Sequence, residues 1–140
     1  MRKQTIGEVA DLVGVDVETI RYYERIGLTI SPSRTRGGHR LYQNANIQRL
    51  RFIRRARDVG FSIEDIRALI EIEKDERRCC SDVRDIAVSN LEKIRAKRAE
   101  LERMEQVLAQ AASACTADDS PLCSILDYLN GAHGAATAPG

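Results

Sequence analysis

The chain has 140 residues and a net charge of +1, with 31% charged and 43% hydrophobic residues. This length allows one domain, or a compact head with an extended arm, and the lack of an apolar run of about 18 residues excludes a membrane-spanning helix. The first 60 residues contain 12 Lys and Arg against 6 Asp and Glu, whereas residues 61–140 contain 10 against 15, which predicts that only the N-terminal part contacts a polyanion such as DNA.

Two short amphipathic helices joined by a tight turn are predicted within residues 5–28. Thr5 and Glu8 have the spacing of a capping box at the start of the first helix. Gly14 is expected to end this helix, because glycine adopts a positive φ at little cost, and Asp16 is a favourable N-cap for the second. This order of elements is typical of a helix-turn-helix DNA reader. The hydroxyl, basic and aromatic residues of the second helix are Thr19, Arg21, Tyr22, Tyr23 and Arg25.

Residues 30–42, ISPSRTRGGHRLY, follow with turn residues and positive charge. Gly37 and Gly38 favour a tight turn, and the short apolar and aromatic end favours a strand. The sequence therefore predicts a small two-stranded wing whose basic loop meets phosphates. Its arginines are Arg34, Arg36 and Arg40.

Two more helices are predicted to complete the N-terminal head. One covers residues 45–58 and ends at Gly60, and the next begins with the capping pair Ser62 and Asp65. The first of these helices contains five arginines, which form either a phosphate-binding face or an ordinary solvent-exposed face; both interpretations stay open at this point.

Residues 81–111 predict one long helix, because they contain neither Gly nor Pro. Apolar residues recur in it at intervals of three, four and seven, with charged residues between them, which is the pattern of a coiled-coil seam. One helix of this length cannot bury such a stripe within a small chain, so a second copy of the chain is the expected partner. The stripe consists of Leu91, Ile94, Leu101, Met104, Leu108 and Ala111. A loop over 116–122, a short helix over 123–129 and a disordered tail over 131–140 are expected to follow.

All four cysteines lie outside the head: Cys79 and Cys80 before the long helix, Cys115 and Cys123 after it. The 35 positions from Cys80 to Cys115 span roughly 50 Å if they are helical, so one chain cannot bring these residues together. Two antiparallel helices can, because the start of one lies beside the end of the other. We therefore expect Cys80 of one subunit to meet Cys115 and Cys123 of its partner, with one such site at each end of the dimer.

Converging thiolates favour soft metal ions. The N-terminus lacks the apolar region of a signal peptide, so we expect a cytoplasmic protein in which thiols stay reduced and serve metal or redox chemistry. A thiol-redox sensor that forms a disulfide between Cys80 and Cys115 of different chains is the rival interpretation. No His or acidic residue completes a triad with a cysteine, so the chain is not expected to be an enzyme.

The motifs VETIRYYERIGL, RTRGGHRLY and RLRFIRRARDVGFSIEDIRALI, which extend to about residue 72, make the chain resemble the MerR family of transcription regulators. This resemblance implies a mainly α fold, with an N-terminal winged helix-turn-helix head, linking helices, a long antiparallel coiled-coil dimerisation helix and a C-terminal metal-binding loop. The expected division is a DNA-binding domain over 1–75, a dimerisation and metal-binding region over 76–130, and the tail. The residues expected to contact DNA are Thr19, Arg21, Tyr22, Tyr23, Arg36, His39, Arg40 and Tyr42.

The resemblance also implies partners and a mechanism. The partners are double-stranded promoter DNA, RNA polymerase and a second copy of the chain, with no membrane. Such a regulator holds a promoter in an unproductive form without metal. With metal it bends and untwists the DNA, so that the two polymerase elements come into register.

The metal-sensing branch of this family has cysteines at the positions of Cys80, Cys115 and Cys123. The copper(I)-sensing branch has serine at the first of these positions, so Cys80 implies divalent ions. The zinc-responsive branch adds a second cysteine beside the first loop cysteine and a loop histidine, whereas this chain has Ala114 and no His in 116–122. Three thiolates then suit Hg(II) as the effector. Cys79 departs from the mercury pattern. Adjacent side chains usually diverge, so we expect Cys79 to be a spectator; as a fourth thiolate it would instead suit Cd(II), Pb(II) or Zn(II).

Overall fold

A computed structural model describes residues 3–30, 32–115 and 123–131 of the chain. The predicted loop over 116–122 and nearly all of the predicted tail lie outside these described residues. The chain divides into two compact units, residues 1–90 and 91–140. It is mainly helical, as the sequence predicted, and no helix in the described part is long and apolar enough to cross a membrane. In order, the elements are α1 (Ile6–Val13), α2 (Val17–Arg25), β1 (Ser33–Arg34), β2 (Arg40–Leu41), α3 (Asn44–Asp58), α4 (Ile63–Lys74), α5 (Cys80–Ala114) and α6 (Ser124–Leu129).

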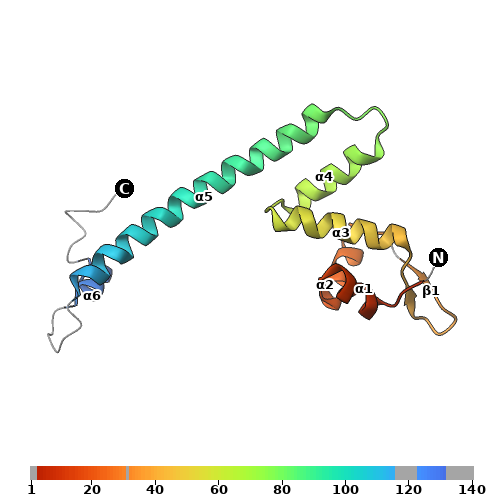
Figure 1. Cartoon of the computed structure of the whole chain (residues 1–140), viewed down its shortest axis with the longest axis horizontal. Helices are drawn as coiled ribbons and strands as arrows, with labels where there is room; N and C mark the ends of the chain where they lie inside the picture. The colour runs from red at the N-terminus through yellow and green to blue at the C-terminus, as the bar shows by residue number, and fades with distance from the viewer. Residues whose placement is uncertain (1–2, 31, 116–122, 132–140) are drawn as a thin grey trace. The chain divides into compact units, whose positions relative to one another are not determined.

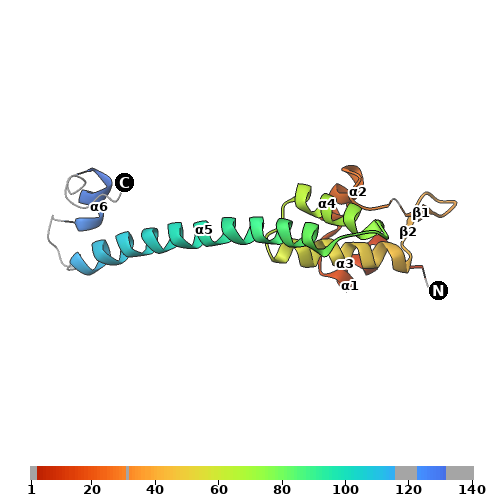
Figure 2. The same cartoon turned by 90° about the horizontal axis from the view of Figure 1, so that it is seen from above.

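The helix-turn-helix forms through the capping residues that the sequence indicated. The amide of Glu8 donates to Thr5 Oγ1 at 3.3 Å, and the amide of Thr5 donates to Glu8 Oε2 at 3.1 Å, which completes the capping box of α1. Asp16 accepts a 2.7 Å hydrogen bond from the amide of Thr19 at the start of α2. These contacts confirm the predicted starts of both helices. Figure 2 shows α1 and α2 together with α3 and α4 in the N-terminal unit.

The turn between α1 and α2 depends on Gly14, whose φ is 77°. Arg54 of α3 donates from Nη1 to the carbonyl of Val13 at 2.8 Å, beside this glycine. A Cβ atom on residue 14 would lie 2.6 Å from Arg54 Nη1. The turn therefore needs glycine for its left-handed backbone and for its contact with α3.

Gly14→Ala is expected to lower the free energy of unfolding by about 1–2 kcal/mol or more, because it adds left-handed strain and displaces Arg54. The control is Gly7→Ala, since Gly7 lies within α1 and a Cβ there would meet nothing within 4 Å. That substitution should raise the free energy of unfolding by about 0.5–1 kcal/mol, because alanine is the better helix former. Urea unfolding curves measure both changes, and a shift of the same sign in the two variants would contradict this account of the turn.

The wing is a short antiparallel hairpin, with Ser33 opposite Leu41 and Arg34 opposite Arg40. Gly38 has a φ of 83° in its turn. Gln4 extends the hairpin on its other side, because its amide donates to the carbonyl of Tyr42 at 3.0 Å and its carbonyl accepts from the amide of Tyr42 at 2.8 Å. The predicted two-stranded wing is therefore present and is tied to the segment that precedes α1.

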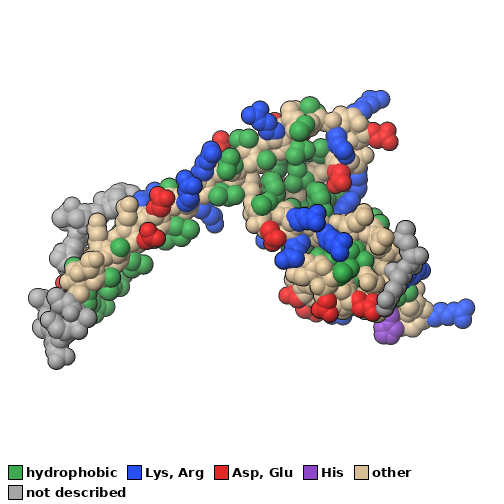
Figure 3. All heavy atoms as spheres, viewed as in Figure 1, with side chains coloured by type: hydrophobic (Ala, Val, Ile, Leu, Met, Phe, Trp, Pro, Cys, Tyr) green, Lys and Arg blue, Asp and Glu red, His purple; other side chains and the backbone are tan. Residues whose placement is uncertain are grey.

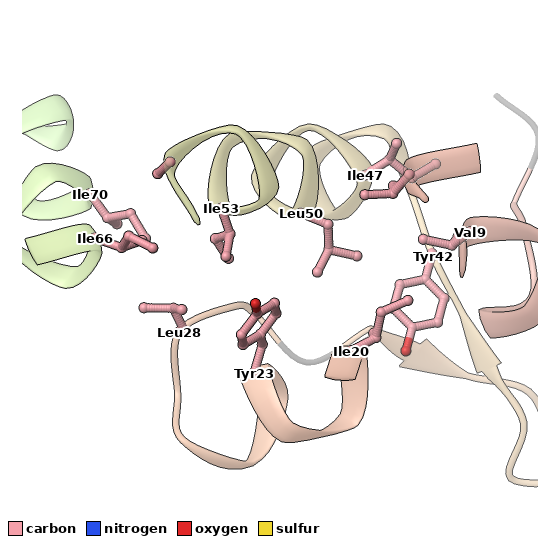
Figure 4. Packing of buried hydrophobic residues seen from close by; sticks show 12 residues of the cluster. Val9, Ile20, Tyr23, Leu28, Tyr42, Ile47, Leu50, Ile53, Ile66 and Ile70 are labelled. Carbon is pink, nitrogen blue, oxygen red and sulfur yellow. The ribbon is translucent and has the colours of Figure 1, made fainter. Parts of the chain in front are cut away.

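The hydrophobic core of the N-terminal unit lies between the helix-turn-helix, α3 and α4 (Figure 4). Ile20 of α2, Leu50 and Ile53 of α3 and Ile66 of α4 are among its most fully buried side chains. The Ser62 hydroxyl accepts from the amide of Asp65 at 3.0 Å, which confirms the predicted cap of α4. This core holds α2 and the wing on one rigid support.

The helix α5 has 35 residues, slightly more than the predicted 81–111 (Figure 1). Asn90 is its buried residue, and its Nδ2 donates to the carbonyl of Val59 at 2.9 Å. The large apolar side chains of the predicted stripe are all exposed, and Leu101 is 63% exposed. Figure 3 shows hydrophobic side chains at the surface of this helix. The stripe is therefore unburied within one chain, as the sequence predicted.

Candidate DNA-binding surface and candidate metal-binding cysteines

The helix α2 exposes one face with basic and aromatic side chains. Arg21, Tyr22 and Arg25 are exposed, and Thr19 is half-buried. Arg21 forms an ion pair with Glu18 at 2.9 Å, and the guanidinium of Arg25 lies 5.7 Å from the centre of the Tyr22 ring. Both arginines are therefore held on the surface, where they are available to an anionic partner.

The wing exposes a second basic surface. Arg34, Arg36 and His39 are exposed, and Arg40 is partly buried. The Nη1 of Arg34 donates to the carbonyl of Gly38 at 3.0 Å across the hairpin turn. These contacts give the wing a basic loop next to a defined turn, which suits contact with phosphates.

Two tyrosines of the expected DNA-contacting set lie in the core instead of on the surface. Tyr23 is 7% exposed and packs on the inner face of α2, three residues after Ile20. Tyr42 is 1% exposed, and Figure 4 shows it among the core side chains. The other members of the expected set are exposed or partly exposed, whereas these two tyrosines are core residues of the head.

A buried carboxylate joins α2 to the wing, and no pattern in the sequence indicated it. Glu24 of α2 accepts a hydrogen bond from the hydroxyl of Tyr42, and its Oε2 lies 3.3 Å from Arg40 Nε. Burial, together with the Glu24 carboxylate, raises the pKa of Tyr42 far above its usual range. The helical pattern shows only that Glu24 lies in an amphipathic helix; its partners come 16 and 18 residues later.

The arginines of α3 serve more than one role. Arg54 and Arg57 donate to the carbonyls of Val13 and Phe61, so they brace the ends of neighbouring segments. Other arginines, Arg49, Arg51 and Arg55, line a groove of about 820 Å³ with apolar side chains of α3, α4 and the start of α5. Two of the five α3 arginines thus bind backbone carbonyls of neighbouring segments, and the other three line the groove.

Cys79 and Cys80 lie at the start of α5, and both are exposed. The sulfur of Cys79 lies 2.9 Å from the hydroxyl oxygen of Ser81. This hydrogen bond lowers the pKa of the Cys79 thiol below its ordinary value. The first cysteine pair is therefore accessible to solvent at the end of a rigid helix.

Cys115 and Cys123 lie beyond the other end of α5, on either side of the predicted loop. The hydroxyl of Ser124, at the start of α6, donates to the carbonyl of Ala111 in the last turn of α5. This contact brings the segments that carry the two cysteines toward each other. Among the described residues of one chain, no group of three or more His, Cys, Asp or Glu side chains is placed to hold a metal ion.

The length of α5 explains why one chain does not assemble the predicted ligand set. A helix of 35 residues is about 52 Å long at 1.5 Å per residue. Cys80 is at its first residue, and Cys115 directly follows its last. The donor types fit a soft cation, but a ligand set that includes Cys80 and Cys115 needs a second chain.

Comparison with known proteins agrees with the observed architecture. Residues 4–72 match the model of the MerR HTH family regulatory protein, and residues 47–111 match the model described as MerR, DNA binding. The two matches together extend from the segment before α1 to the last turns of α5.

The chain is also similar to individual proteins over most of its length. It is 44% identical to the HTH-type transcriptional regulator ZntR of Escherichia coli K12, over 89% of this chain and 90% of that protein. The lead(II) complex of the transcription regulator PbrR691 from Ralstonia metallidurans CH34 superposes with a TM-score of 0.73 at 34% identity, covering 92% of this chain and 98% of that one. The mercury(II) complex of the regulator MerR from Bacillus megaterium MB1 has a TM-score of 0.67 at 33% identity, with coverage of 91% and 99%. The chain therefore belongs to the MerR family of helix-turn-helix regulatory proteins, which are DNA-binding regulators and not enzymes.

Proposed function

We propose that this protein is a homodimeric, metal-responsive transcription regulator. It represses its promoter without metal and activates it when a soft divalent cation, Hg(II) first among them, binds at both ends of the dimer. The observation that carries the proposal is the placement of thiols at both ends of one helix whose apolar stripe is exposed. That helix needs a second chain, and a second chain completes the thiol set.

The head supplies the DNA-binding surface of the proposed regulator. Thr19, Arg21 and Tyr22 of α2 approach the major groove, while Arg36, His39 and Arg40 of the wing approach the flanking phosphates. The exposure of the basic residues on α2 and the wing supports these roles. Two heads related by a two-fold axis then recognise a palindromic promoter site, in the cytoplasm and together with RNA polymerase.

The dimer is antiparallel along α5. Its seam consists of the exposed apolar stripe, and burying that stripe supplies the driving force for association. This arrangement places Cys80 of one subunit beside Cys115 and Cys123 of the other. Residues 76–130 thus form the dimerisation and metal-binding region, and residues 1–75 form the DNA-binding domain.

Hg(II) is the preferred effector because the proposed set contains three thiolates and mercury accepts low coordination. The solved complexes of related regulators hold mercury(II) in one case and lead(II) in another, so metal-binding relatives support the class of effector and leave its identity open. Cys79 decides between alternatives: if it joins the set as a fourth thiolate, Cd(II), Pb(II) or Zn(II) is favoured. A thiol-redox regulator with a disulfide between Cys80 and Cys115 of different chains is the second candidate, supported by the exposed thiol of Cys80 and the partly exposed thiol of Cys115.

Metal occupancy acts on transcription by changing the relative pose of the two heads. The metal-bound dimer bends and untwists the promoter and so aligns the polymerase elements, while the metal-free dimer holds the DNA unproductively. The deformation of the DNA costs about 1–6 kcal/mol, which the difference in binding between the two states must supply.

Metal titration of the purified protein tests this function. Ultraviolet thiolate-to-metal absorption should show two tight sites per dimer, with Hg(II) displacing Cd(II), Pb(II) and Zn(II). Transcription from the bound promoter should rise with the same metal. A protein that binds none of these ions, but forms a reversible disulfide between chains, would instead favour the redox alternative.

Arg21→Ala is expected to weaken promoter binding by about 1–3 kcal/mol, because an exposed arginine of the recognition helix makes direct base or phosphate contacts. Metal binding should not change, since the thiols lie on α5 and beyond it. The control is Arg103→Ala, which removes the same charge from an exposed position of α5. Fluorescence anisotropy with labelled promoter DNA measures both variants, and equal affinities would mean that α2 is not the recognition helix.

A further inference from the structure

We propose that Glu24 is a positioning residue that fixes the wing against the recognition helix, so that both present one surface to the DNA backbone. The inference rests on the proposed DNA-binding function and extends it to a buried residue that touches no DNA. Glu24 acts through Arg40 and Tyr42, which belong to the wing and its end.

Glu24 has a buried carboxylate whose two oxygens each have a polar partner. Its carboxylate is 6% exposed, accepts from the Tyr42 hydroxyl and forms an ion pair with Arg40 at 3.3 Å. A buried carboxylate is costly unless its charge and its oxygens are satisfied, and here one oxygen meets the guanidinium and the other meets the phenol. A tyrosine hydroxyl is protonated at physiological pH, so Tyr42 donates to the Glu24 carboxylate there.

The Glu24 link adds to the pairing of Gln4 with Tyr42, because the hairpin alone is too short to fix its own position. Each of its strands has two residues, and an isolated two-stranded hairpin is marginally stable in water. Arg40 and Tyr42 are two residues apart in an extended segment, so both side chains reach the same face, where Glu24 lies. The carboxylate therefore holds the wing to α2 through two contacts at adjacent points of one face.

A basic pocket between α2 and the wing is the surface that Glu24 organises. It has a volume of about 300 Å³, and Glu24 is its acidic residue among arginines of both elements. One carboxylate beneath several guanidinium groups offsets their mutual repulsion and leaves a net positive pocket of a size suited to a phosphate. The pocket is lined by Arg21, Glu24, Arg25, Pro32, Arg34 and Arg40.

The direction in which DNA affinity changes when a carboxylate is removed separates a positioning role of Glu24 from a simple effect of its charge. Removing a negative charge near DNA should strengthen binding, and Glu18→Gln, on the same helix with a side chain 80% exposed, provides that reference. Glu24→Gln removes the same charge but is expected to weaken binding about tenfold, because phosphate contacts of the wing are lost. For the same reason the fall of log affinity with log salt should become less steep, by about 1 in slope. Glu18→Gln frees Arg21 from its 2.9 Å ion pair, so it should not make the salt dependence weaker.

The experiment uses the full-length dimer and a duplex recovered by selection from randomised DNA with the wild-type protein. If the wild type recovers no duplex, the proposed function fails before any variant is compared. If the wild type binds and Glu24→Gln behaves like Glu18→Gln, or weakens binding with an unchanged salt slope, the positioning role is overturned. Thermal unfolding checks the fold of each variant. Should Glu24→Gln not fold, Tyr42→Phe removes only the hydroxyl, and an unchanged salt slope in that folded variant would equally overturn the proposal.

Discussion

A dimer assembled from one Cys80→Ser subunit and one Cys115→Ser subunit is expected to keep one tight metal site, although each homodimer of these variants has none. When sites are shared across an antiparallel seam, one site of this heterodimer lacks both thiolates and the other is complete. When sites lie within single chains, each site lacks one ligand. Differently tagged subunits allow the heterodimer to be purified and titrated with Hg(II). One tight Hg(II) site per heterodimer indicates shared sites, and no tight site indicates sites within single chains.

The single variants define the reference for that result. Each of three variants should lose metal-dependent activation: Cys80→Ser, Cys115→Ser and Cys123→Ser. The metal affinity of each should fall by at least about a hundredfold, because each removes one of three soft ligands. Promoter binding should persist, since the head is unchanged. Cys79→Ser is the matched control, because it removes a thiol one residue from Cys80. A loss of response in that control would make Cys79 a ligand and favour Cd(II), Pb(II) or Zn(II), and a heterodimer without any tight site would defeat the shared-site arrangement.

Leu101→Lys is expected to raise the dissociation constant of the dimer by at least about a hundredfold, which corresponds to about 2.7 kcal/mol. The substitution places a charge in the apolar stripe of α5, and a twofold seam contains it twice. Gln106→Lys adds the same charge to an exposed position of α5 outside the stripe and should have little effect. Sedimentation at micromolar concentration, with and without metal, measures both. A wild-type protein that stays monomeric there, or two variants with equal association, would contradict the seam.

Local features of the fold were predictable because short-range chemistry determines them. The capping pairs at Thr5 and Ser62 and the left-handed Gly14 follow from residues within one or two turns, and the long α5 follows from a run without Gly or Pro. The need for a second chain was equally accessible, because an apolar stripe without anything to cover it is visible in the sequence. The ligand set of Cys80, Cys115 and Cys123 stays a prediction, since it requires two chains.

Contacts over longer separations were not predictable from the pattern. Arg54 braces α1, and Arg67 donates to the carbonyl of Ile26 at 2.9 Å, each across 41 residues. No periodicity distinguishes such an arginine from one on the surface. Tyr23 was accessible to sequence reasoning, because it follows Ile20 at helical spacing and so shares its inward face. Tyr42 was not, because its burial depends on Glu24 and on the pairing with Gln4.

The uncovered stripe of α5 means that the stability of this regulator is not a property of one molecule. Where a seam supplies much of the folding free energy, mass action makes the thermal midpoint rise with protein concentration. A newly made chain that has not met a second copy keeps a row of apolar side chains in water, which is the surface that chaperones and proteases act on. The amount of regulator in a cell therefore influences how long each copy survives, independently of any effector.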